Sequence, residues 1–202
     1  MNIVVTGAAG FMGSHICDAL INENLQVVGI DDLSGGFLEN VNDKVDFVKC
    51  DISDQESVQN LWTSKGPFHR VFHLAAYAAE GLSHFIRRFN YNNNLIGSIN
   101  LINAAVKSET CECFVFTSSI AAYGEQNPPL LESTIPLPAD PYGIAKYAVE
   151  LDLKSAHEMW GLNSVIFRPH NVYGKRQNIM DPYRNVVGIF MRCAIEGKSF
   201  PI

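Results

Sequence analysis

The 202-residue sequence has no long apolar run, no cluster of lysine or arginine, and few charged residues of either sign. Charged residues make up 18% of the chain, and 15 Lys and Arg oppose 21 Asp and Glu for a net charge of −6. The first apolar stretch, Ile3 to Val5, is far too short for a signal sequence or a membrane span. Because nucleic acids and anionic membranes attract basic patches, we expect neither as a partner, and we expect a cytoplasmic protein.

Cysteine is sparse, and its spacing excludes the common structural roles. The cysteines are odd in number and lack the paired spacing of zinc sites: Cys17, Cys50, Cys111, Cys113 and Cys193. Disulfides are rare in the cytosol, so we expect all five to be reduced packing residues. On the same grounds we predict no bound metal.

Apolar residues form 47% of the chain and fall into short continuous runs separated by helix-like stretches. The runs predict strands at Asn2–Thr6, Gln26–Ile30, Val45–Val48, Arg70–Leu74, Cys113–Ser118 and Ser164–Arg168. Because they are continuous rather than alternating, they indicate strands buried on both faces. Helices are predicted at Met12–Asn22, Gln55–Trp62, Asn93–Lys107, Pro141–Trp160 and Tyr183–Glu196, with a surface loop at Asn127–Pro141. This order predicts an α/β fold with a parallel, doubly wound sheet, the Rossmann fold.

A glycine-rich turn links the first predicted strand to the first helix, with the spacing Gly7-x-x-Gly10-x-x-Gly13. Gly7 permits a tight turn, Gly10 lets backbone amides approach a diphosphate, and Gly13 lets the helix pack close to the sheet. Taken alone, the pattern also fits a plain strand–helix turn.

Asp31 strengthens the dinucleotide interpretation, because it ends the second strand 24 residues after Gly7. A carboxylate there accepts both ribose hydroxyls and repels a 2′-phosphate, which favours NAD over NADP. Asp32 is either a second ligand or a simple turn residue. Asp51 suits a contact to the adenine amino group, but it equally suits a cap for a helix beginning near Ser53.

Two further motifs carry possible chemistry. Tyr142 and Lys146 are four residues apart and share a face of a predicted helix, where the ammonium group lowers the pKa of the phenol toward neutrality. A hydroxyl from the serine-rich end of the fifth strand, at Ser118 and Ser119, can bond a substrate hydroxyl at the carboxyl edge of the sheet. Each motif is weak alone, since Tyr-x-x-x-Lys arises by chance and serines at strand ends often bond their own loop.

The motifs occur in one order: glycine loop, acid, serine-rich strand end, Tyr-x-x-x-Lys. On these residues the sequence resembles the extended short-chain dehydrogenases/reductases, and among them the UDP-glucose 4-epimerases and their sugar-nucleotide relatives. Further matches are the segments Asp31–Ser34, His73–Ala76, Asn94–Gly97 and Arg168–Gly174, and the resemblance covers essentially the whole chain.

The resemblance implies a role for each matching residue. NAD would be the cofactor, lined by Gly7, Gly10, Phe11, Met12, Gly13, Asp31, Asp32, Asp51, Ile52, Leu74, Ala75, Ala76, Asn94, Thr117, Tyr142, Lys146 and His170. Ser119, Tyr142 and Lys146 would be catalytic, and Ser119, Tyr142 and Asn171 would contact a UDP-sugar. The implied reaction is epimerisation at C4: Tyr142 takes the proton of the 4-hydroxyl, C4 passes a hydride to NAD⁺, and the hydride returns to the other face of the 4-keto sugar.

The residues after Ser119 favour an epimerase within this family. Related dehydratases carry Thr-Asp-Glu here and related decarboxylases a glutamate, whereas this chain has Ile120 and Ala121, which cannot move a proton. A reductase or dehydrogenase with the same three catalytic residues stays open. So does an NAD-binding module without turnover.

Three departures from the family remain. A lysine that contacts NAD in relatives aligns near Ala78, and the nearby Arg87 and Arg88 either meet an anion or lie on a solvated helix face. By resemblance, residues 1–174 form the NAD-binding domain, and residues 175–202 begin a substrate part that is largely missing. We therefore expect Ser164–Arg168 to be an unpaired or poorly covered sheet edge. The family also dimerises through a helix bundle, which implies a homodimer built on Asn93–Lys107 and Pro141–Trp160.

Overall fold

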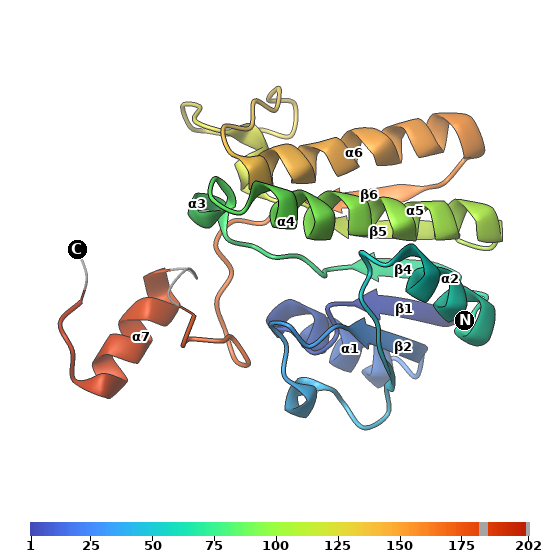
Figure 1. The fold of residues 1–202 in the computed structure, drawn as a ribbon, viewed down its shortest axis with the longest axis horizontal. Helices are drawn as coiled ribbons and strands as arrows, with labels where there is room; N and C mark the ends of the chain where they lie inside the picture. The colour runs from blue at the N-terminus through green and yellow to red at the C-terminus, as the bar shows by residue number, and fades with distance from the viewer. Residues whose placement is uncertain (182–185, 201–202) are drawn as a thin grey trace.

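The computed structural model describes residues 1–181 and 186–200 of the chain. Six parallel strands form one sheet in the order β3-β2-β1-β4-β5-β6 (Figure 1). The strands are β1 Asn2–Thr6, β2 Gln26–Asp31, β3 Asp46–Lys49, β4 Arg70–His73, β5 Cys113–Thr117 and β6 Ser164–Phe167. The order reverses between β1 and β4, which is where doubly wound sheets bind their ligands. The predicted fold class is confirmed.

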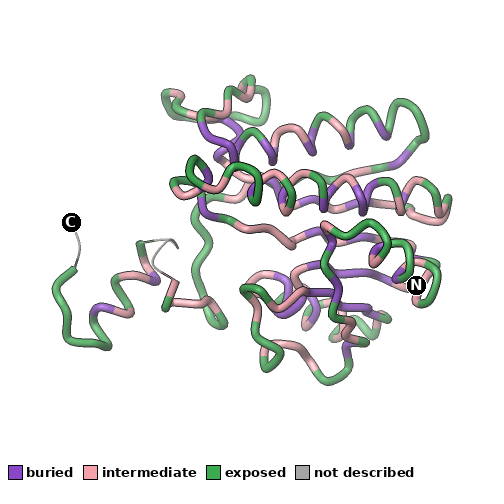
Figure 2. The backbone as a smooth tube through the Cα atoms, in the orientation of Figure 1, coloured by how far each residue is buried: buried purple, intermediate pink, exposed green. Residues whose placement is uncertain are grey.

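The helices lie on both faces of the sheet, and alternate side chains of β1 show which helix covers which face. Val4 belongs to one core with residues of α2 Gln55–Lys65, α5 Gly97–Ser108 and α6 Pro141–Trp160. Ile3 and Val5 belong to a second, smaller core with residues of α1 Phe11–Asn22. Buried positions are dense along the central strands and on the inner sides of these helices (Figure 2).

The short elements between these helices depart from the prediction in one place. The predicted helix Asn93–Lys107 is a π-helical turn at Asn92–Ile96 followed by α5. Three short pieces precede or follow it: α3 Glu80–Ser83, α4 Arg87–Tyr91 and the 3₁₀ turn η3 Ile120–Tyr123. An earlier 3₁₀ turn, η1, spans Leu38–Asn40. π-Helical turns are frequent at functional sites, and this one places Asn94 in the interior.

Local capping explains where two helices begin. The Asp140 carboxylate accepts hydrogen bonds from the amides of Tyr142 and Gly143, and Pro141 occupies the first turn, so α6 spans the predicted residues. Asp54 caps α2 in the same way. The alternative role of Asp51 as the cap of this helix is therefore wrong; its carboxylate accepts instead from the amide of Ser53.

β6 is the exposed edge of the sheet, as predicted. It pairs only with β5 among the described residues. Val165, Ile166 and Phe167 keep 44%, 37% and 55% of their surface exposed. The prediction that every strand is buried on both faces is therefore wrong for β6 and also for the other edge strand, β3, in which Asp46 and Lys49 are exposed. The chain up to β6 forms the layered body, while α7 Val186–Glu196 stands away from it (Figure 1).

Three further predictions concern the cysteines, membrane spans and the last predicted helix. All five cysteines are free. No described helix has the length and apolarity needed to cross a bilayer. The predicted helix Tyr183–Glu196 begins at Val186 in the described part of the chain, and Tyr183 lies outside it.

Candidate functional site

A cleft of about 470 Å³ opens at the carboxyl ends of β1, β2, β4 and β5. It is lined by all but one of the predicted site residues: Gly7, Gly10, Phe11, Met12, Gly13, Asp31, Asp32, Asp51, Ile52, Leu74, Ala75, Ala76, Thr117, Ser119, Tyr142, Lys146, His170 and Asn171. The exception is Asn94. Arg87 and Arg88 are not among the lining residues. Within the described residues, no three His, Cys, Asp or Glu side chains are grouped so that they could hold a metal ion.

The glycine loop has the geometry that a dinucleotide diphosphate requires. Gly7 has a φ of +71°, and a Cβ there would lie 2.9 Å from the amide nitrogen of Ala75. A Cβ on Gly13 would lie 2.0 Å from the carbonyl oxygen of Gly7, so only glycine lets α1 pack this close. Gly10 is the N-cap of α1, and no side chain caps the first-turn amides. Those amides and the positive end of the helix dipole suit a diphosphate.

Asp31 is held rigidly at the end of β2. Its two carboxylate oxygens accept hydrogen bonds from the amides of Ala9 at 3.1 Å and Leu33 at 2.8 Å. Burial raises the pKa of Asp31, while these amides act in the opposite direction. The neighbouring Asp32 accepts from the amide and hydroxyl of Ser34, so it is a turn residue as well as part of the lining.

Asn94 lies beneath the cleft rather than in its wall. It is 1% exposed, and its side chain bonds the amide and carbonyl groups of Tyr77 at 2.8 and 3.0 Å. It also donates to Asn90, which donates to the carbonyl oxygen of Pro141 at the start of α6. Asn94 therefore connects the loop after β4 to the start of α6, and its neighbour Asn93 lines the cleft.

A buried polar chain connects this point to the glycine loop. The Thr6 hydroxyl accepts from the amide of Ala75 and lies 2.7 Å from Nδ1 of His73. Nε2 of His73 lies 2.8 Å from the hydroxyl of Ser98, which donates to the carbonyl oxygen of Asn94. Burial lowers the pKa of His73 well below its usual value, so the imidazole is neutral. Buried hydrogen bonds beneath the cleft thus connect the end of β1 to the loop after β4 and to Asn94.

Tyr142 and Lys146 come together on the first turns of α6, as their spacing predicts. Nζ of Lys146 lies 5.9 Å from the centre of the Tyr142 ring and donates to the carbonyl oxygen of Thr117 at 2.8 Å. Burial lowers the pKa of Lys146 to about 7, while Glu150 acts in the opposite direction. A group with this pKa gains or loses its charge near neutral pH, where a proton relay works.

The two serines at the end of β5 have different partners. The Ser119 hydroxyl accepts from the amide of Ala121 at 3.1 Å and lines the cleft, so both roles considered for it are compatible. The Ser118 hydroxyl is buried and donates to the carboxylate of Glu150. Both serines line the cleft, but the Ser118 hydroxyl is already bonded to Glu150, so Ser119 is the better candidate for a contact with substrate.

Glu150 and Arg168 form a partly buried ion pair that the sequence reasoning missed. Arg168 contacts the Glu150 carboxylate through Nε at 2.9 Å and through a terminal nitrogen at 2.5 Å. The Arg168 guanidinium also lies 4.6 Å from the centre of the Tyr123 ring. The hydrogen bonds that Arg168 donates to the Glu150 carboxylate raise the pKa of Arg168. Two sequence features could have indicated this pair. Glu150 lies four residues after Lys146 on the same helix face, and Arg168 begins the segment Arg168–Gly174 that matches the family.

The chain after β6 completes the cleft. Pro169, His170, Asn171 and Val172 line it, and so do three residues that the sequence reasoning missed: Arg176, Gln177 and Asn178. This segment follows the exposed strand, so its place against the glycine loop depends on side-chain contacts. The predicted roles of His170 beside the nicotinamide and Asn171 at the substrate stay predictions.

Comparisons with known proteins agree with this arrangement. A model of the NAD dependent epimerase/dehydratase family matches residues 3–202. UDP-glucose 4-epimerase of Thermotoga maritima, solved with UDP-glucose, is 38% identical over 98% of the chain, with a TM-score of 0.93. The enzyme of Thermus thermophilus, solved with NAD, is 36% identical over 100% of the chain, with a TM-score of 0.92. UDP-N-acetylglucosamine 4-epimerase of Methanobrevibacter ruminantium, solved with UDP-N-acetylmuramic acid, is 39% identical over 98%, with a TM-score of 0.90. The chain covers 64% of each of these proteins.

Proposed function

Because the chain belongs to the NAD dependent epimerase/dehydratase family, we propose that it performs the NAD-dependent epimerisation of a UDP-sugar at C4. The observation that carries the proposal is one cleft in which Tyr142, Lys146 and Ser119 lie with the glycine loop and Asp31. The cofactor of the family is NAD. The residues fit it, since the loop needs glycine at Gly7 and Gly13 and a carboxylate ends β2.

The residues of the chain divide the chemistry among them. Bound NAD⁺ supplies a hydride acceptor for C4 and afterwards a hydride donor. Tyr142 takes the proton of the sugar 4-hydroxyl and later returns it. Lys146 supplies positive charge beside the phenol and is itself oriented by the carbonyl oxygen of Thr117. Ser119 holds the reacting oxygen through a hydrogen bond.

The environment of Ser119 favours epimerisation over elimination. Ile120 and Ala121 follow it in η3, and neither side chain transfers protons. A dehydratase needs an additional acid and base at this place to expel water. The transfer of a hydride out and back needs only Ser119, Tyr142 and the cofactor.

We propose a UDP-sugar as the substrate class and leave the sugar open. The similar proteins differ in this respect, since one is named for UDP-glucose and another for UDP-N-acetylglucosamine. Asn171 lines the cleft and is the residue expected to contact the nucleotide diphosphate.

A second candidate function is NAD binding without turnover. The chain spans 64% of the length of the solved epimerases that it matches. In this second candidate the cleft binds the cofactor, but the chain does not convert a sugar. The two candidates share every NAD contact and differ only in turnover.

We further propose a homodimer through α5 and α6, and a cytoplasmic location. Exposed apolar side chains on and beside these helices support the dimer: Ile96, Ile144 and Leu151. Ile102 and Ala156, on the same two helices, are buried in the core of the chain instead. The five free cysteines suit a reducing compartment.

The test combines two measurements on the same purified chain. NAD⁺ binding is measured by calorimetry, and UDP-galactose with NAD⁺ is followed by proton NMR of the anomeric signal. Appearance of UDP-glucose supports the epimerase, and Tyr142→Phe is expected to lower the rate at least about a hundredfold while NAD⁺ still binds. If NAD⁺ binds but neither UDP-galactose nor UDP-N-acetylgalactosamine is converted, the second candidate holds. If NAD⁺ does not bind, both are wrong.

A further inference from the structure

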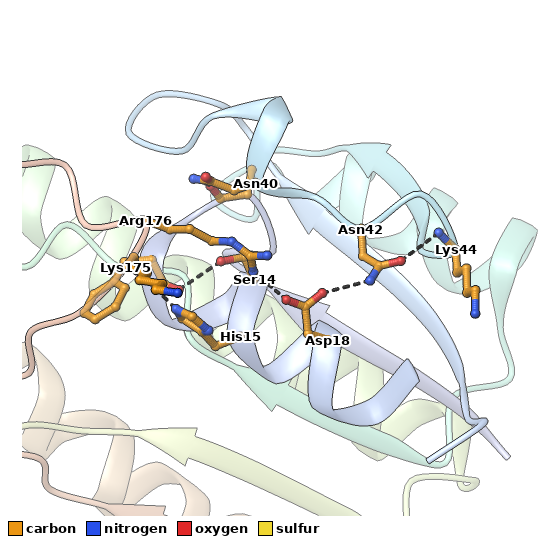
Figure 3. A network of polar contacts seen from close by, with 10 residues as sticks. Ser14, His15, Asp18, Asn40, Asn42, Lys44, Lys175 and Arg176 are labelled. Atoms are coloured by element: carbon orange, nitrogen blue, oxygen red, sulfur yellow. Dashed lines mark hydrogen bonds and ion pairs between the residues drawn. The ribbon is translucent and has the colours of Figure 1, made fainter. Parts of the chain in front are cut away.

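Residues 174–178, which begin at the last residue of the matched segment Arg168–Gly174, cross α1 (Figure 3). A Cβ on Gly174 would lie 3.3 Å from the Phe11 ring, so this backbone passes directly over that side chain. The carbonyl oxygen of Lys175 lies 3.1 Å from Nε2 of His15. The rings of Phe11 and His15 pack edge to face 5.8 Å apart. Residues 174–178 thus pack on the face of α1 that carries Phe11 and His15.

The strongest contact of this segment is an ion pair between Arg176 and Asp18. A terminal nitrogen of Arg176 lies 2.6 Å from Oδ2 of Asp18, and the two side chains are 33% and 28% exposed. The other carboxylate oxygen of Asp18 accepts from the side-chain amide of Asn42 at 2.9 Å. Partial burial acts to raise the pKa of Asp18, but the hydrogen bonds from Asn42 and Arg176 outweigh it and hold the pKa below its usual value.

The same network reaches the loop after β2. Asn42 belongs to that loop, and Asn40 in it donates to the carbonyl oxygen of Ala9 in the glycine loop at 3.0 Å. Asp18 therefore joins three parts of the chain: α1, the loop after β2 and the segment 174–178 (Figure 3). Each of these parts contributes residues to the lining of the cleft, among them Phe11, Asn40 and Arg176.

The backbone of Arg176 is held in an unfavourable conformation. Its φ is +66°, a region that residues other than glycine rarely adopt. Such a conformation persists when surrounding contacts determine it, and it is concentrated at ligand clamps and switches. The segment is otherwise exposed from Asn171 to Arg176. The ion pair and the contact with His15 are therefore what keep it against α1.

We propose that residues 174–178 are a clasp that closes over the bound dinucleotide, and that Arg176, held by Asp18, is the positioning residue of the clasp. The clasp joins the rim of the cleft to the helix whose N-terminus receives the diphosphate. The cleft whose residues fit the cofactor is lined by both the glycine loop and the chain after β6, so NAD bound there would leave only when the clasp opens. The proposal rests on the proposed NAD binding and adds a determinant of how slowly NAD is released.

Release of NADH tests the clasp directly. The chain is loaded with NADH and mixed with excess NAD⁺ in a stopped-flow instrument, and the fall in NADH fluorescence gives the dissociation rate. Asp18→Asn keeps the shape of the side chain but removes its charge, and Arg176→Ala removes the partner. Each variant is expected to release NADH about five- to twentyfold faster, as for a partly buried ion pair that holds the closed state.

A double variant and a neighbour give the controls. The pair Asp18→Asn with Arg176→Ala is expected to release NADH no faster than either single variant, because both remove one interaction. Lys175→Ala removes a charge from the same segment but leaves the backbone contact to His15, and it is expected to stay within about twofold of the unchanged chain. Melting temperatures without NADH separate the clasp from a general loss of folding, and they are expected to change little.

Three outcomes are distinguishable. Faster release in the two single variants, without additivity, supports the clasp. Release rates within about twofold of the unchanged chain overturn the clasp and leave the proposed NAD site intact. Failure of the unchanged chain to bind NADH overturns the proposed function and the clasp together.

Discussion

The body of the sheet and the chain from β6 onward are assembled differently, although both begin from the same kind of apolar strand. In β1 and β5, Val4, Val5, Phe114 and Phe116 have no exposed surface. In β6, Phe167 keeps 55% of its surface exposed. The strand sequences do not explain this difference, because both are apolar and hydrogen-bonded in register. Packing against the helices does: residues of β1 belong to the apolar cores on both faces of the sheet, whereas no described residue of β6 belongs to either core.

The two halves of the cleft follow the same division. The cofactor side is determined by backbone packing that tolerates no side chain at Gly7 and Gly13. The side formed after β6 is held by long-range side-chain pairs, Glu150 with Arg168 and Asp18 with Arg176. We therefore expect changes in the first region to affect folding, and changes in the second to affect the closure of the site more than the fold.

The largest effect expected from this comparison is on two phenylalanines of neighbouring strands. Phe114→Ala opens a cavity in the main core and is expected to lower the free energy of unfolding by about 3–5 kcal/mol. Phe167→Ala, on the exposed strand, is expected to cost less than about 1 kcal/mol. Urea unfolding of both variants measures the two values. Equal losses would mean that β6 is covered in solution.

A smaller effect is expected from glycine replacements. Gly13→Ala places a methyl group 2.0 Å from the carbonyl oxygen of Gly7, and backbone atoms cannot move away cheaply. We expect a loss of roughly 3 kcal/mol in stability and at least about tenfold weaker NAD⁺ binding. Gly81→Ala in α3 is the control, since nothing lies within 4 Å of its added Cβ. Thermal unfolding and calorimetry check both; an unchanged Gly13→Ala chain would contradict the tight packing of α1.

The junction between the two regions predicts the next effect. Glu150→Gln leaves the charge of Arg168 uncompensated at a site where that side chain is 19% exposed. Breaking a fully buried pair costs about 3–5 kcal/mol, so for this partly exposed arginine we expect roughly 2 kcal/mol. Glu158→Gln lies on the same helix in an exposed pair with Lys154 and is expected to cost less than about 0.5 kcal/mol. If Glu150→Gln and Glu158→Gln lower the free energy of unfolding equally, the Glu150–Arg168 ion pair does not hold the two regions together.

The division between the regions also explains what the sequence could predict. The bounds of α6, the turn at Gly7 and the place of Asp31 follow from local rules of capping, glycine conformation and strand ends. Asp18 and Arg176 are 158 residues apart in the sequence, and no local sequence pattern at either residue predicts their contact. Asn94 was predicted in the cofactor lining, but the π-helical turn directs it into the interior. Long-range pairs and irregular helices depend on tertiary packing, which the sequence patterns do not contain.

The smallest effect concerns Lys146, whose charge lies at the boundary of the two regions. Burial lowers its pKa from the usual 10.5 to about 7 in the folded chain without cofactor. Between these two values the unfolded chain binds more protons than the folded chain, so a rise in pH stabilises the fold. Lys146→Met has no titrating amine, so it lacks this pH-dependent contribution to stability, but it keeps an apolar side chain of similar length. The free energy of unfolding of the unchanged chain minus that of Lys146→Met is therefore expected to rise by roughly 1 kcal/mol between about pH 7.5 and 8.5. The raised pKa values of the buried thiols, such as Cys17 at about 12, are common to both chains and cancel in this difference. Urea unfolding at the two pH values gives the result, and a difference that stays constant would show that Lys146 keeps an ordinary pKa through contact with water.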